Sequence, residues 1–546
     1  MRANRTRRRG GLRRALEGLV LGAAIGLAGP VAAGPLSLAG LGAAQPFPVF
    51  EQALAEAVAQ NPALDAFYRA TEFAPVWTGA EHAARRAALV AALSRAADHG
   101  LPAARYDLPG LLSAFASVES ERDRGRAEAR ASAAFARYAR DLSSGVLEPR
   151  RIVGQIVREL PRPDIERLMH DFTAAEPAAF FRDLAPRAPE YARLLRAKRQ
   201  LEAQIARGGW GPLVPEATLR PGATGAGVIA LRNRLIAMGY MPRAATARYD
   251  GALQRAVQAF QIAHGLEPDG IAGPKTLAAV NVEPAERRRA ILVALERERW
   301  LNIERGERHI WVNLADFHAR IVDHDRVTLE TRAVIGARQS DMQTPEFSHR
   351  MTYLELNPDW TLPRSIVARS YWDGLVRGGH RYLQVIDQNG REIPREAIDF
   401  SRYTARNFPF RLRQPPGPTN PLGLVKFMFP NPYAIYLHDS PARQLFGTTV
   451  RTHSSGCVRL NDPEAFAYEL LSRQTDDPAQ LYQSTLRRGN LQRIYLDEPV
   501  PIHLVYRTAF TSVDGEMNYR DDVYGRDARL YEALRAAGVE SEAGRS

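Results

Sequence analysis

The chain has 546 residues, of which 45% are hydrophobic and 25% are charged. This composition is typical of a folded globular protein and excludes a chain that is mainly disordered. Because one domain usually takes about 100–200 residues, the length predicts several domains. The formal charge of +12 is small for such a chain, so no nucleic-acid partner is expected. At most, this charge fits a neighbourhood of anionic polymer or membrane surface.

The first 33 residues differ from the rest of the chain. Arginines precede an apolar run at 18–29, and Val31, Ala32 and Ala33 supply the small residues after which signal peptidases cleave. The apolar run is shorter than the ~20 residues that a membrane span needs. We therefore predict a signal peptide at 1–33, export, and no stable membrane span after its removal.

Residues 44–212 show the periodicity of α-helices. Between 80 and 100, apolar residues recur at three- and four-residue spacing, and Gly100 stands where a helix C-terminus is capped. Similar patterns cover 125–143 and 189–207, and each is followed by glycine. No cluster of carboxylates, histidines or glycines indicates chemistry in this region. We predict an all-α scaffold domain here.

Residues 215–282 contain three short predicted helices. The segments LRNRLIAMGY and AVQAFQIAHGLEPDGIAGPKTL hold two amphipathic helices that end at Gly239 and Gly265, then a turn at 269–273 before the third helix. These segments resemble the three-helix peptidoglycan-binding module of bacterial cell-wall enzymes. The resemblance implies a peptidoglycan-binding-like domain with the glycan as partner, and a plain spacer is the alternative.

The pattern changes again after a charged connecting helix, which we predict at 283–304. Alternating β-rich runs follow at 309–314, 319–322, 332–336 and 351–356. They predict a mainly β domain over 305–515, sandwich-like or a partly closed barrel. Its insertion at 371–419 mixes aromatic residues with arginines, and we expect an ordered capping lid. A last strand at 503–510 and a C-terminal helix and tail at 516–546 complete the expected order.

Cys457 is the only cysteine of the chain and the candidate nucleophile. Exported proteins usually pair their cysteines in disulfides, so a single thiol in that setting is expected to have a function. A thiol needs a base to become a good nucleophile, and His438 is the candidate. It stands at the end of an apolar run, 433–437, that predicts a strand. Asp439 begins the turn that follows and would help to orient His438.

The residues around Cys457 predict how the substrate is held. Gly456 lets the backbone bend, so the N–H groups of Gly456 and Cys457 are the proposed oxyanion donors. Arg459 follows two residues later, and its guanidinium can hold a substrate carboxylate with two hydrogen bonds. Asn461 lies close by on the same segment.

The stretch from His438 to Asn461, with SSGCVR at 454–459, resembles the L,D-transpeptidase family with its YkuD-type catalytic domain. The histidine that this family usually has before the glycine is Ser455 here. The periplasmic YcbB-like branch also carries SSGCVR, and its signatures are similar to NPDW at 357–360, RQPPGPTNPLGLVKFMFPN at 413–431 and HLVYRTAF near the C-terminus. The order of scaffold, peptidoglycan-binding module and catalytic domain is also similar.

The resemblance implies a periplasmic enzyme of peptidoglycan biosynthesis, with no cofactor or metal. Cys457 would attack the amide between the third and fourth residues of a stem peptide, while His438 takes the proton and returns it. An amine from another stem would then form a 3–3 cross-link. Tyr436, Trp360 and Ser455 would line the substrate pocket together with Arg459 and Asn461. Carbapenem-type inhibitors are expected to bind.

Three alternatives remain open at this stage. The same dyad would serve an L,D-carboxypeptidase or an enzyme that attaches proteins to peptidoglycan. The chain could also be a wall-binding scaffold without activity, although the pairing of His438 with Cys457 argues against this. A zinc site built from His438, His453 and Cys457 lacks a fourth ligand at suitable spacing.

Overall fold

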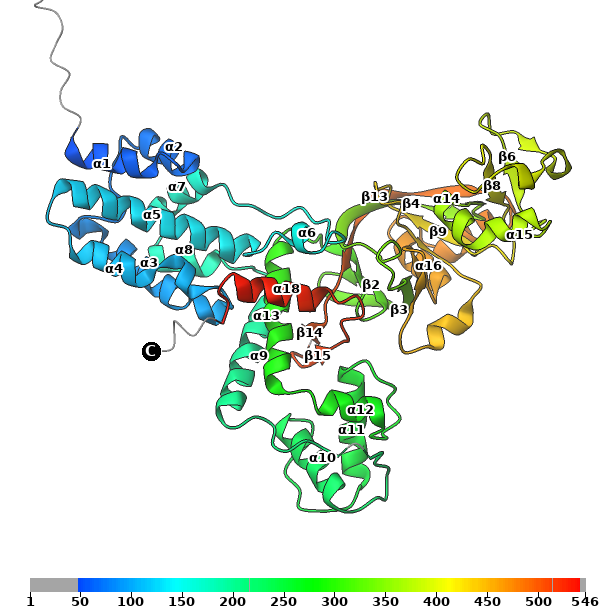
Figure 1. Cartoon of the computed structure of the whole chain (residues 1–546), viewed down its shortest axis with the longest axis horizontal. Helices are drawn as coiled ribbons and strands as arrows, with labels where there is room; N and C mark the ends of the chain where they lie inside the picture. The colour runs from blue at the N-terminus through cyan, green and yellow to red at the C-terminus, as the bar shows by residue number, and fades with distance from the viewer. Residues whose placement is uncertain (1–47, 216, 513, 541–546) are drawn as a thin grey trace, which may run out of the picture. The chain divides into compact units, whose positions relative to one another are not determined.

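The computed structural model describes residues 48–215, 217–512 and 514–540 (Figure 1). The expected signal peptide at 1–33 lies outside these residues, as do the first residues of the expected scaffold domain and the end of the tail. Within the described residues, no helix combines the length and the apolar character that crossing a membrane would require.

The region from residue 49 to residue 206 is all-helical, as predicted. Its helices are α1 (Val49–Val58), α2 (Pro62–Ala70), α3 (Ala83–Ser94), α4 (Leu108–Ala116), α5 (Glu121–Ser144), α6 (Pro149–Ile152), α7 (Ile165–Ala174), α8 (Pro177–Asp183) and α9 (Pro189–Ala206). The long helix α5 begins where the Ser120 side chain accepts a hydrogen bond from the N–H of Asp123. Its fully buried Glu128 accepts hydrogen bonds from the N–H groups of Trp77 and Thr78, which fixes that loop against the helix.

The next unit has the three predicted helices, α10 (Ala226–Ala237), α11 (Gly251–Ala263) and α12 (Pro274–Val280). Their periodic apolar residues form its core: Val228, Leu231, Leu235, Leu253, Val257 and Phe260. Gln261 is buried and joins α11 to the turn before α12. It accepts a hydrogen bond from Gly270 N at 2.9 Å and donates one to Asp269 Oδ1 at 2.8 Å. The unit is therefore held together by a polar contact as well as by its core.

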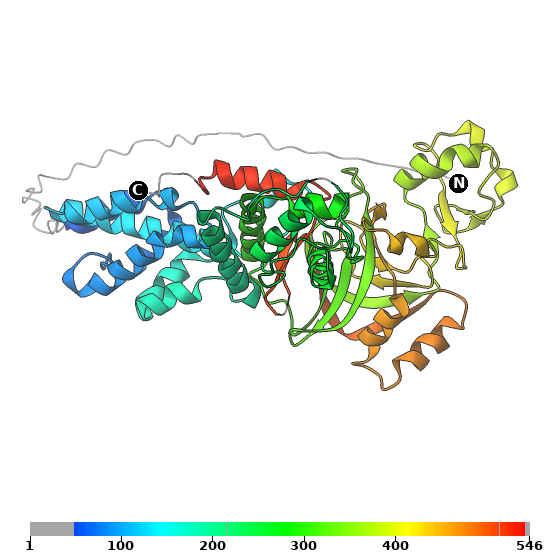
Figure 2. The same cartoon turned by 90° about the horizontal axis from the view of Figure 1, so that it is seen from below.

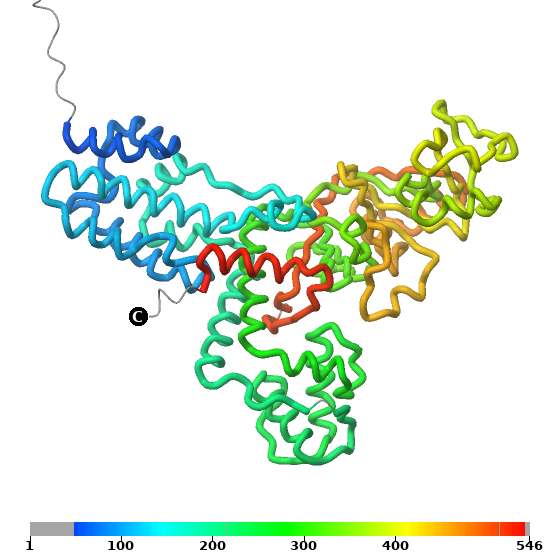
Figure 3. The backbone as a smooth tube through the Cα atoms, in the orientation of Figure 1, coloured from blue at the N-terminus to red at the C-terminus, as the bar shows by residue number. Residues whose placement is uncertain are grey.

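Helix α13 (Pro284–Trp300) connects this unit to the β-rich region, as predicted. It packs against α9 through Ile291 and Leu295 and against α18 (Arg526–Ala536) through Leu292. Figure 3 shows the C-terminal helix, in red, crossing this green helix. Arg297 on α13 is buried and forms ion pairs with Glu346 and Asp527.

The catalytic region is mainly β, with one nine-stranded mixed sheet. The strands are β1 (Arg308–Asn313), β2 (His318–Asp323), β3 (Arg326–Gly336), β4 (Phe347–Leu356), β9 (Val425–Met428), β10 (Leu437–His438), β11 (Thr452–Ser454), β12 (Val458–Leu460) and β13 (Gln492–Val505). Their order is β11-β3-β12-β10-β9-β4-β13-β1-β2, and β2 also pairs with β3. The sheet therefore closes on itself, and Figure 2 shows its strong curvature.

This closure makes the sheet barrel-like, which is the second of the two mainly β arrangements that the strand pattern predicts. Strand β3 is long enough to serve two neighbours, because its residues 326–332 pair with β2 while Ala333 and Val334 pair with β12. One sheet is thus bent around a single core, in which Ile310, Leu354 and Leu437 are fully buried. The predicted short strands were right, but their layering depends on pairings between distant segments.

The capping insertion is ordered and has a core of its own. It contains β5 (Trp360–Thr361), α14 (Arg364–Ile366), a π-helical turn at Val367–Tyr371, α15 (Trp372–Val376), β6 (Gln384–Ile386), β7 (Glu392–Ile393) and β8 (Arg411–Gln414). A four-stranded sheet of order β5-β8-β6-β7 joins these segments, so the subdomain begins near Trp360, earlier than residue 371. Its buried residues include Leu375, Phe400, Phe408 and Leu412.

Two expected strands differ in the structure. The run at 433–437 is mostly irregular, because Asn431 Oδ1 accepts hydrogen bonds from Tyr433 N and Ile435 N, and Ala434 has φ +54°. Only Leu437 and His438 remain as strand. The run at 503–510 is divided between the end of β13 and the start of β14 (Ala509–Thr511).

The C-terminal part of the catalytic region adds elements that the strand pattern did not predict. Strand β14 forms a hairpin with β15 (Met517–Tyr519), so the expected boundary at 515 cuts through that hairpin. Helices α16 (Pro463–Leu471) and α17 (Pro478–Leu486) follow the candidate site. Each begins with proline after aspartate, a start signal that the sequence does contain.

Candidate active site

Strand register brings the candidate residues to one face of the sheet. In the parallel pair of β10 and β12, His438 stands opposite Arg459, and in the antiparallel pair of β10 and β9 it stands opposite Lys426. Tyr436 comes just before β10 and Cys457 just before β12, and the centre of the Tyr436 ring lies 5.6 Å from that of His438. The residues between them, including Leu437 and Val458, are fully buried in the core.

His438 is buried and its tautomer is set by the backbone. Nδ1 lies 2.5 Å from the carbonyl oxygen of Asp439. A carbonyl oxygen only accepts hydrogen bonds, so Nδ1 carries the hydrogen and Nε2 has a free lone pair. Burial, followed by the positive charge of Arg459, lowers the pKa of His438 to about 3. The resting imidazole is therefore neutral and can accept a proton at Nε2.

Asp439 holds the carbonyl that orients His438. Its carboxylate accepts hydrogen bonds from Leu424 N at 2.8 Å, Ser440 N at 2.6 Å and Arg443 Nη2 at 2.7 Å. Gly423 makes room for this carboxylate, since a Cβ there would lie 2.1 Å from Asp439 Oδ2. The aspartate thus acts on the histidine through backbone position and does not contact the ring as a carboxylate.

Cys457 follows a tight turn and is partly exposed. Gly456 before it has φ +125°, a conformation that side-chain-bearing residues rarely adopt. The thiol donates to the carbonyl of Ala434 at 3.6 Å. Burial raises the pKa of the Cys457 thiol, while a hydrogen bond with Tyr436 acts in the opposite direction. No direct hydrogen bond joins Cys457 to His438 among the described residues.

The two expected oxyanion donors, the N–H groups of Gly456 and Cys457, differ in their hydrogen-bond partners. The N–H of Gly456 donates to Ser454 Oγ at 3.1 Å. Ser454 Oγ also contacts the carbonyl of Cys457, so this serine closes the turn. No hydrogen bond of the Cys457 N–H is found within the described part of the chain. The Cys457 amide is thus the more available donor.

Arg459 has an environment typical of a ligand-binding residue. Its guanidinium makes no ion pair with any described residue, and its buried Nε atom has no hydrogen-bond partner among them. Burial lowers the pKa of Arg459, and the charge of an ionised Cys457 opposes this. A buried guanidinium without a partner is costly unless it binds something. A carboxylate of the substrate would supply the missing charge.

The remaining expected pocket residues are Tyr436, Trp360, Ser455 and Asn461. Tyr436 packs both against the catalytic core and against the core of the capping insertion, to which Trp360 belongs. Ser455 is exposed beside Cys457. Asn461 donates its side-chain amide to Asp462 at 3.0 Å, outside the group around Cys457. The exposed His453 contacts the carbonyl of Val450.

Lys426 and Glu355 are site residues that sequence reasoning missed. Lys426 Nζ lies 4.5 Å from the centre of the Tyr436 ring and 2.9 Å from Glu355 Oε2. Arg493 also pairs with Glu355 at 3.1 Å. These residues come from β9, β4 and β13, and only the strand register brings them together. Within the described residues, no group of three histidine, cysteine or carboxylate side chains could hold a metal ion.

In the resting enzyme the Cys457 thiol and the His438 imidazole are both uncharged, which has a measurable consequence. Burial raises the pKa of the Cys457 thiol and lowers that of His438, so both groups are neutral between pH 6 and 8. Only a thiolate is alkylated, and its fraction then grows about tenfold per pH unit. We expect the rate of iodoacetamide labelling of Cys457 to rise steeply over this range. A rate that is constant down to pH 6 would instead show a preformed thiolate and imidazolium pair.

Thr344 is a candidate positioning residue for the Gly456 turn. Its buried hydroxyl accepts a hydrogen bond from Gly336 N at 2.9 Å and donates one to Gly456 O at 2.7 Å. Thr344→Val removes both bonds inside the core. We expect a loss of about 1–3 kcal/mol in the free energy of unfolding, because buried polar groups lose their partners.

Kinetic constants distinguish a positioning role of Thr344 from a role in stability alone. If Thr344 positions the turn, its valine variant should lower kcat while KM stays near the original value. Thr344→Ser keeps the hydroxyl and should restore kcat. Equal kcat values in the valine and serine variants would show that Thr344 serves stability only.

Comparison with known proteins identifies the domains of the chain. Three family models match the chain: a scaffold domain at 62–197, a "Putative peptidoglycan binding domain" at 224–280, and an L,D-transpeptidase catalytic domain at 307–486. A protein of Haemophilus influenzae named "Putative L,D-transpeptidase" is 27% identical over 226 residues. The match covers 40% of this chain and 45% of that protein, so the chain spans less than half of the relative's length.

A solved structure of an L,D-transpeptidase from Xylanimonas cellulosilytica is 17% identical to the chain, with a TM-score of 0.16. The match covers 54% of this chain and 98% of that chain. The family models define the class: residues 307–486 match an L,D-transpeptidase catalytic domain. More specifically, this domain follows matches to a scaffold domain and to a peptidoglycan-binding domain in the same chain.

Proposed function

We propose that the enzyme forms 3–3 cross-links in peptidoglycan through a thioester on Cys457. The single observation that carries the proposal is Arg459 on β12, two residues after Cys457, whose buried Nε atom has no hydrogen-bond partner among the described residues. Stem peptides carry free carboxylates next to the amide that would be cleaved. An arginine two residues from the nucleophile can hold such a carboxylate and place the amide carbonyl against the thiol.

In the first half-reaction, His438 Nε2 takes the thiol proton as the sulfur attacks the carbonyl carbon of the third stem residue. The carbon–sulfur bond forms, and the oxyanion is stabilised by the N–H of Cys457. The C–N bond then breaks, and the protonated histidine gives its proton to the leaving D-alanine amine. Hydrogen bonds between catalytic groups are often absent before substrate binds, so the present contact of the thiol with Ala434 is compatible with this step.

In the second half-reaction, an amine of another stem attacks the thioester and loses a proton to His438. The new C–N bond forms, the carbon–sulfur bond breaks, and the thiolate regains the proton. Water in place of the amine would give an L,D-carboxypeptidase. The capping insertion, which meets the site at Tyr436, would exclude water from the thioester. A carbapenem-type inhibitor would acylate the same sulfur.

We also propose that the enzyme acts in the periplasm, after removal of residues 1–33. Support comes from the basic and apolar pattern of that segment and from the peptidoglycan-binding domain at 224–280. The expected domain divisions are part of the same proposal, with the boundaries adjusted for the hairpin of β14 and β15 and for the start of the capping insertion.

Product analysis tests the proposed reaction. Purified enzyme is incubated with disaccharide tetrapeptides, and the products are weighed by mass spectrometry. The proposal predicts dimers that contain one tripeptide and one tetra- or tripeptide stem, with release of D-alanine. Tripeptide monomers alone would show a carboxypeptidase. No change in the substrate would leave the non-catalytic scaffold as the better account.

A further inference from the structure

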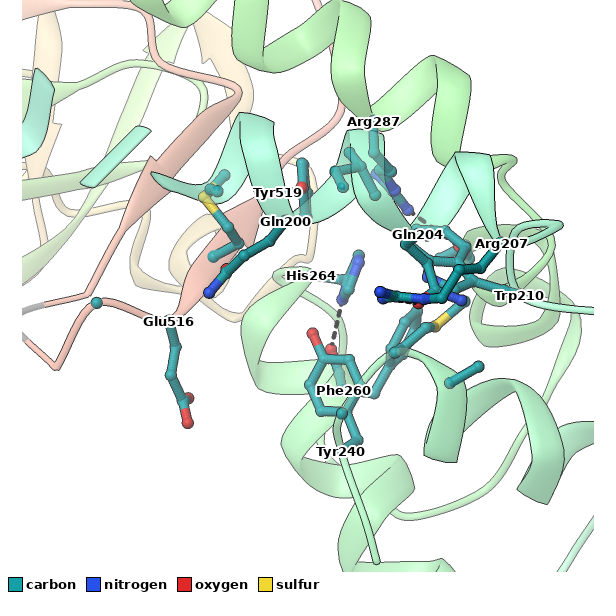
Figure 4. Close-up of a pocket in the computed structure, with 18 residues that line it drawn as sticks. Gln200, Gln204, Arg207, Trp210, Tyr240, Phe260, His264, Arg287, Glu516 and Tyr519 are labelled. Carbon is teal, nitrogen blue, oxygen red and sulfur yellow. Dashed lines mark hydrogen bonds between the residues drawn. The ribbon is translucent and has the colours of Figure 1, made fainter. Parts of the chain in front are cut away.

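A cavity of about 390 Å³ lies outside the candidate active site. It is bounded by the C-terminal half of α9, the three-helix unit of α10 to α12, and the hairpin of β14 and β15 (Figure 4). Pockets of this size usually hold small ligands or single units of a polymer. The cavity therefore belongs to no single domain and joins the peptidoglycan-binding unit to its neighbours.

The walls of the cavity are largely aromatic. His264 lies in the middle of the lining, stacked on Phe260 at 3.8 Å between ring centres, with Tyr240 beside them (Figure 4). Tyr519 faces His264 with its ring centre 5.6 Å away, and Trp210 lines the opposite side. Burial lowers the pKa of His264 to about 3, so this ring is neutral at ordinary pH.

Several polar groups of the lining have no partner within the described residues. They are the hydroxyls of Tyr240 and Tyr519, the indole N–H of Trp210 and the side-chain amide of Gln200. His264 Nδ1 lies 2.8 Å from the carbonyl of Phe260, so Nε2 is left as an acceptor. The cavity thus offers donors and acceptors beside apolar ring faces.

Two cationic side chains line the cavity, and both already have partners. Arg207 is exposed and donates to Gln204 Oε1 at 2.9 Å, whereas Arg287 donates to the carbonyl of Ala279 at 3.0 Å and covers the Tyr519 ring. A cavity for an anion would have these guanidinium groups at its centre. The arrangement instead suits a neutral ligand that has apolar faces and many hydroxyl or amide groups.

We propose that this composite cavity binds an N-acetylated sugar unit of the glycan strand. Sugar rings have apolar C–H faces that pack on aromatic rings, and their hydroxyl and acetamido groups pair with Gln200, Tyr240 and His264. Arg207 at the edge would meet a carboxylate of the attached stem peptide. The proposal rests on the proposed function for its choice of polymer, and it adds α9 and β15 to the binding surface.

A second cavity of about 740 Å³ offers a path along which the glycan strand would continue. It shares His264, Arg287 and Tyr519 with the first cavity. Its lining includes residues 447–451, which precede β11 and the Cys457 turn. A glycan strand bound in the first cavity could therefore continue along the second cavity toward the catalytic segment.

Binding is measured by calorimetry with the full chain carrying Cys457→Ala, so that turnover plays no part. The probes are the peptide-free disaccharide of N-acetylglucosamine and N-acetylmuramic acid, its dimer, and the free tripeptide stem. We expect the sugars to bind. Gln200→Ala and Tyr240→Ala should each weaken sugar binding about tenfold, a change that corresponds to ~1.4 kcal/mol.

Asn233→Ala is the matched control, because Asn233 is an exposed amide on α10 that does not line the cavity. Its sugar affinity should equal that of the parent protein. Tyr240→Phe removes only one hydroxyl and guards against a general loss of structure. Equal sugar binding in all variants, binding of the tripeptide alone, or no binding would overturn the proposal. Since Cys457 is absent, each result is independent of transpeptidase activity.

Discussion

Replacing Cys457 by alanine is expected to lower the rate of tetrapeptide turnover by about 10⁴-fold or more, the scale of loss when a covalent nucleophile is removed. Its thiol is the only one in the chain, and it comes just before β12, in which Arg459 stands opposite His438. The side chain is partly exposed, so the free energy of unfolding should change by no more than ~1 kcal/mol. The measurement is release of D-alanine under saturating donor.

Two histidine variants make this prediction specific. His438→Ala should cause a loss of similar size, because nucleophile and base act as one unit. His453→Ala should leave the rate within about twofold, since that ring is exposed and contacts only the carbonyl of Val450. A large loss in the His453 variant together with a small loss in the His438 variant would show that His453, and not His438, is the base.

Replacing Glu346 by alanine is expected to cost about 3–5 kcal/mol in the free energy of unfolding, as is usual when one partner of a buried ion pair is removed. Glu346 is 2% exposed and pairs with Arg297 of α13 and with Arg526 of α18, which are equally buried. Without Glu346, two guanidinium groups would remain in the interior with too little negative charge. Chemical denaturation of both proteins measures the difference.

Glu532→Ala is the control for this prediction. Glu532 also pairs with an arginine, Arg535, at 2.9 Å, but 61% of its side chain is exposed. Exposed ion pairs contribute little, so the expected change is within ~1 kcal/mol. Similar losses in the two variants would mean that the buried network does not hold α13 and α18 to the catalytic region.

Local patterns in the sequence predicted much of this molecule. Helix periodicity and glycine stops located α9, α10 and α11 within a few residues. The assignment of Cys457 and His438, which rests on the chemistry of a lone thiol, stays a prediction. The features that the sequence patterns missed depend on contacts between distant segments. Strand register alone places Lys426 beside Tyr436, and a single residue, Asn431, makes an apparent strand irregular.

The role of Asp439 shows the same limit. The family resemblance implied that the backbone at Asp439 orients His438, but the hydrogen bonds that hold the Asp439 carboxylate and the space left by Gly423 appear only in three dimensions. Thr344 carries no signal in the sequence, since its importance comes from the approach of β3 to the Cys457 turn. Nonlocal hydrogen bonds of this kind have no periodicity to detect.

Intact mass of the protein during turnover tests the central proposal most directly. The enzyme is mixed with a tetrapeptide donor without an acceptor, quenched in acid within seconds, and weighed. The proposed mechanism predicts an added mass equal to the donor minus D-alanine, localised to Cys457 by peptide mapping and absent from Cys457→Ala. Turnover without any adduct, or an adduct on another residue, would contradict a Cys457 thioester.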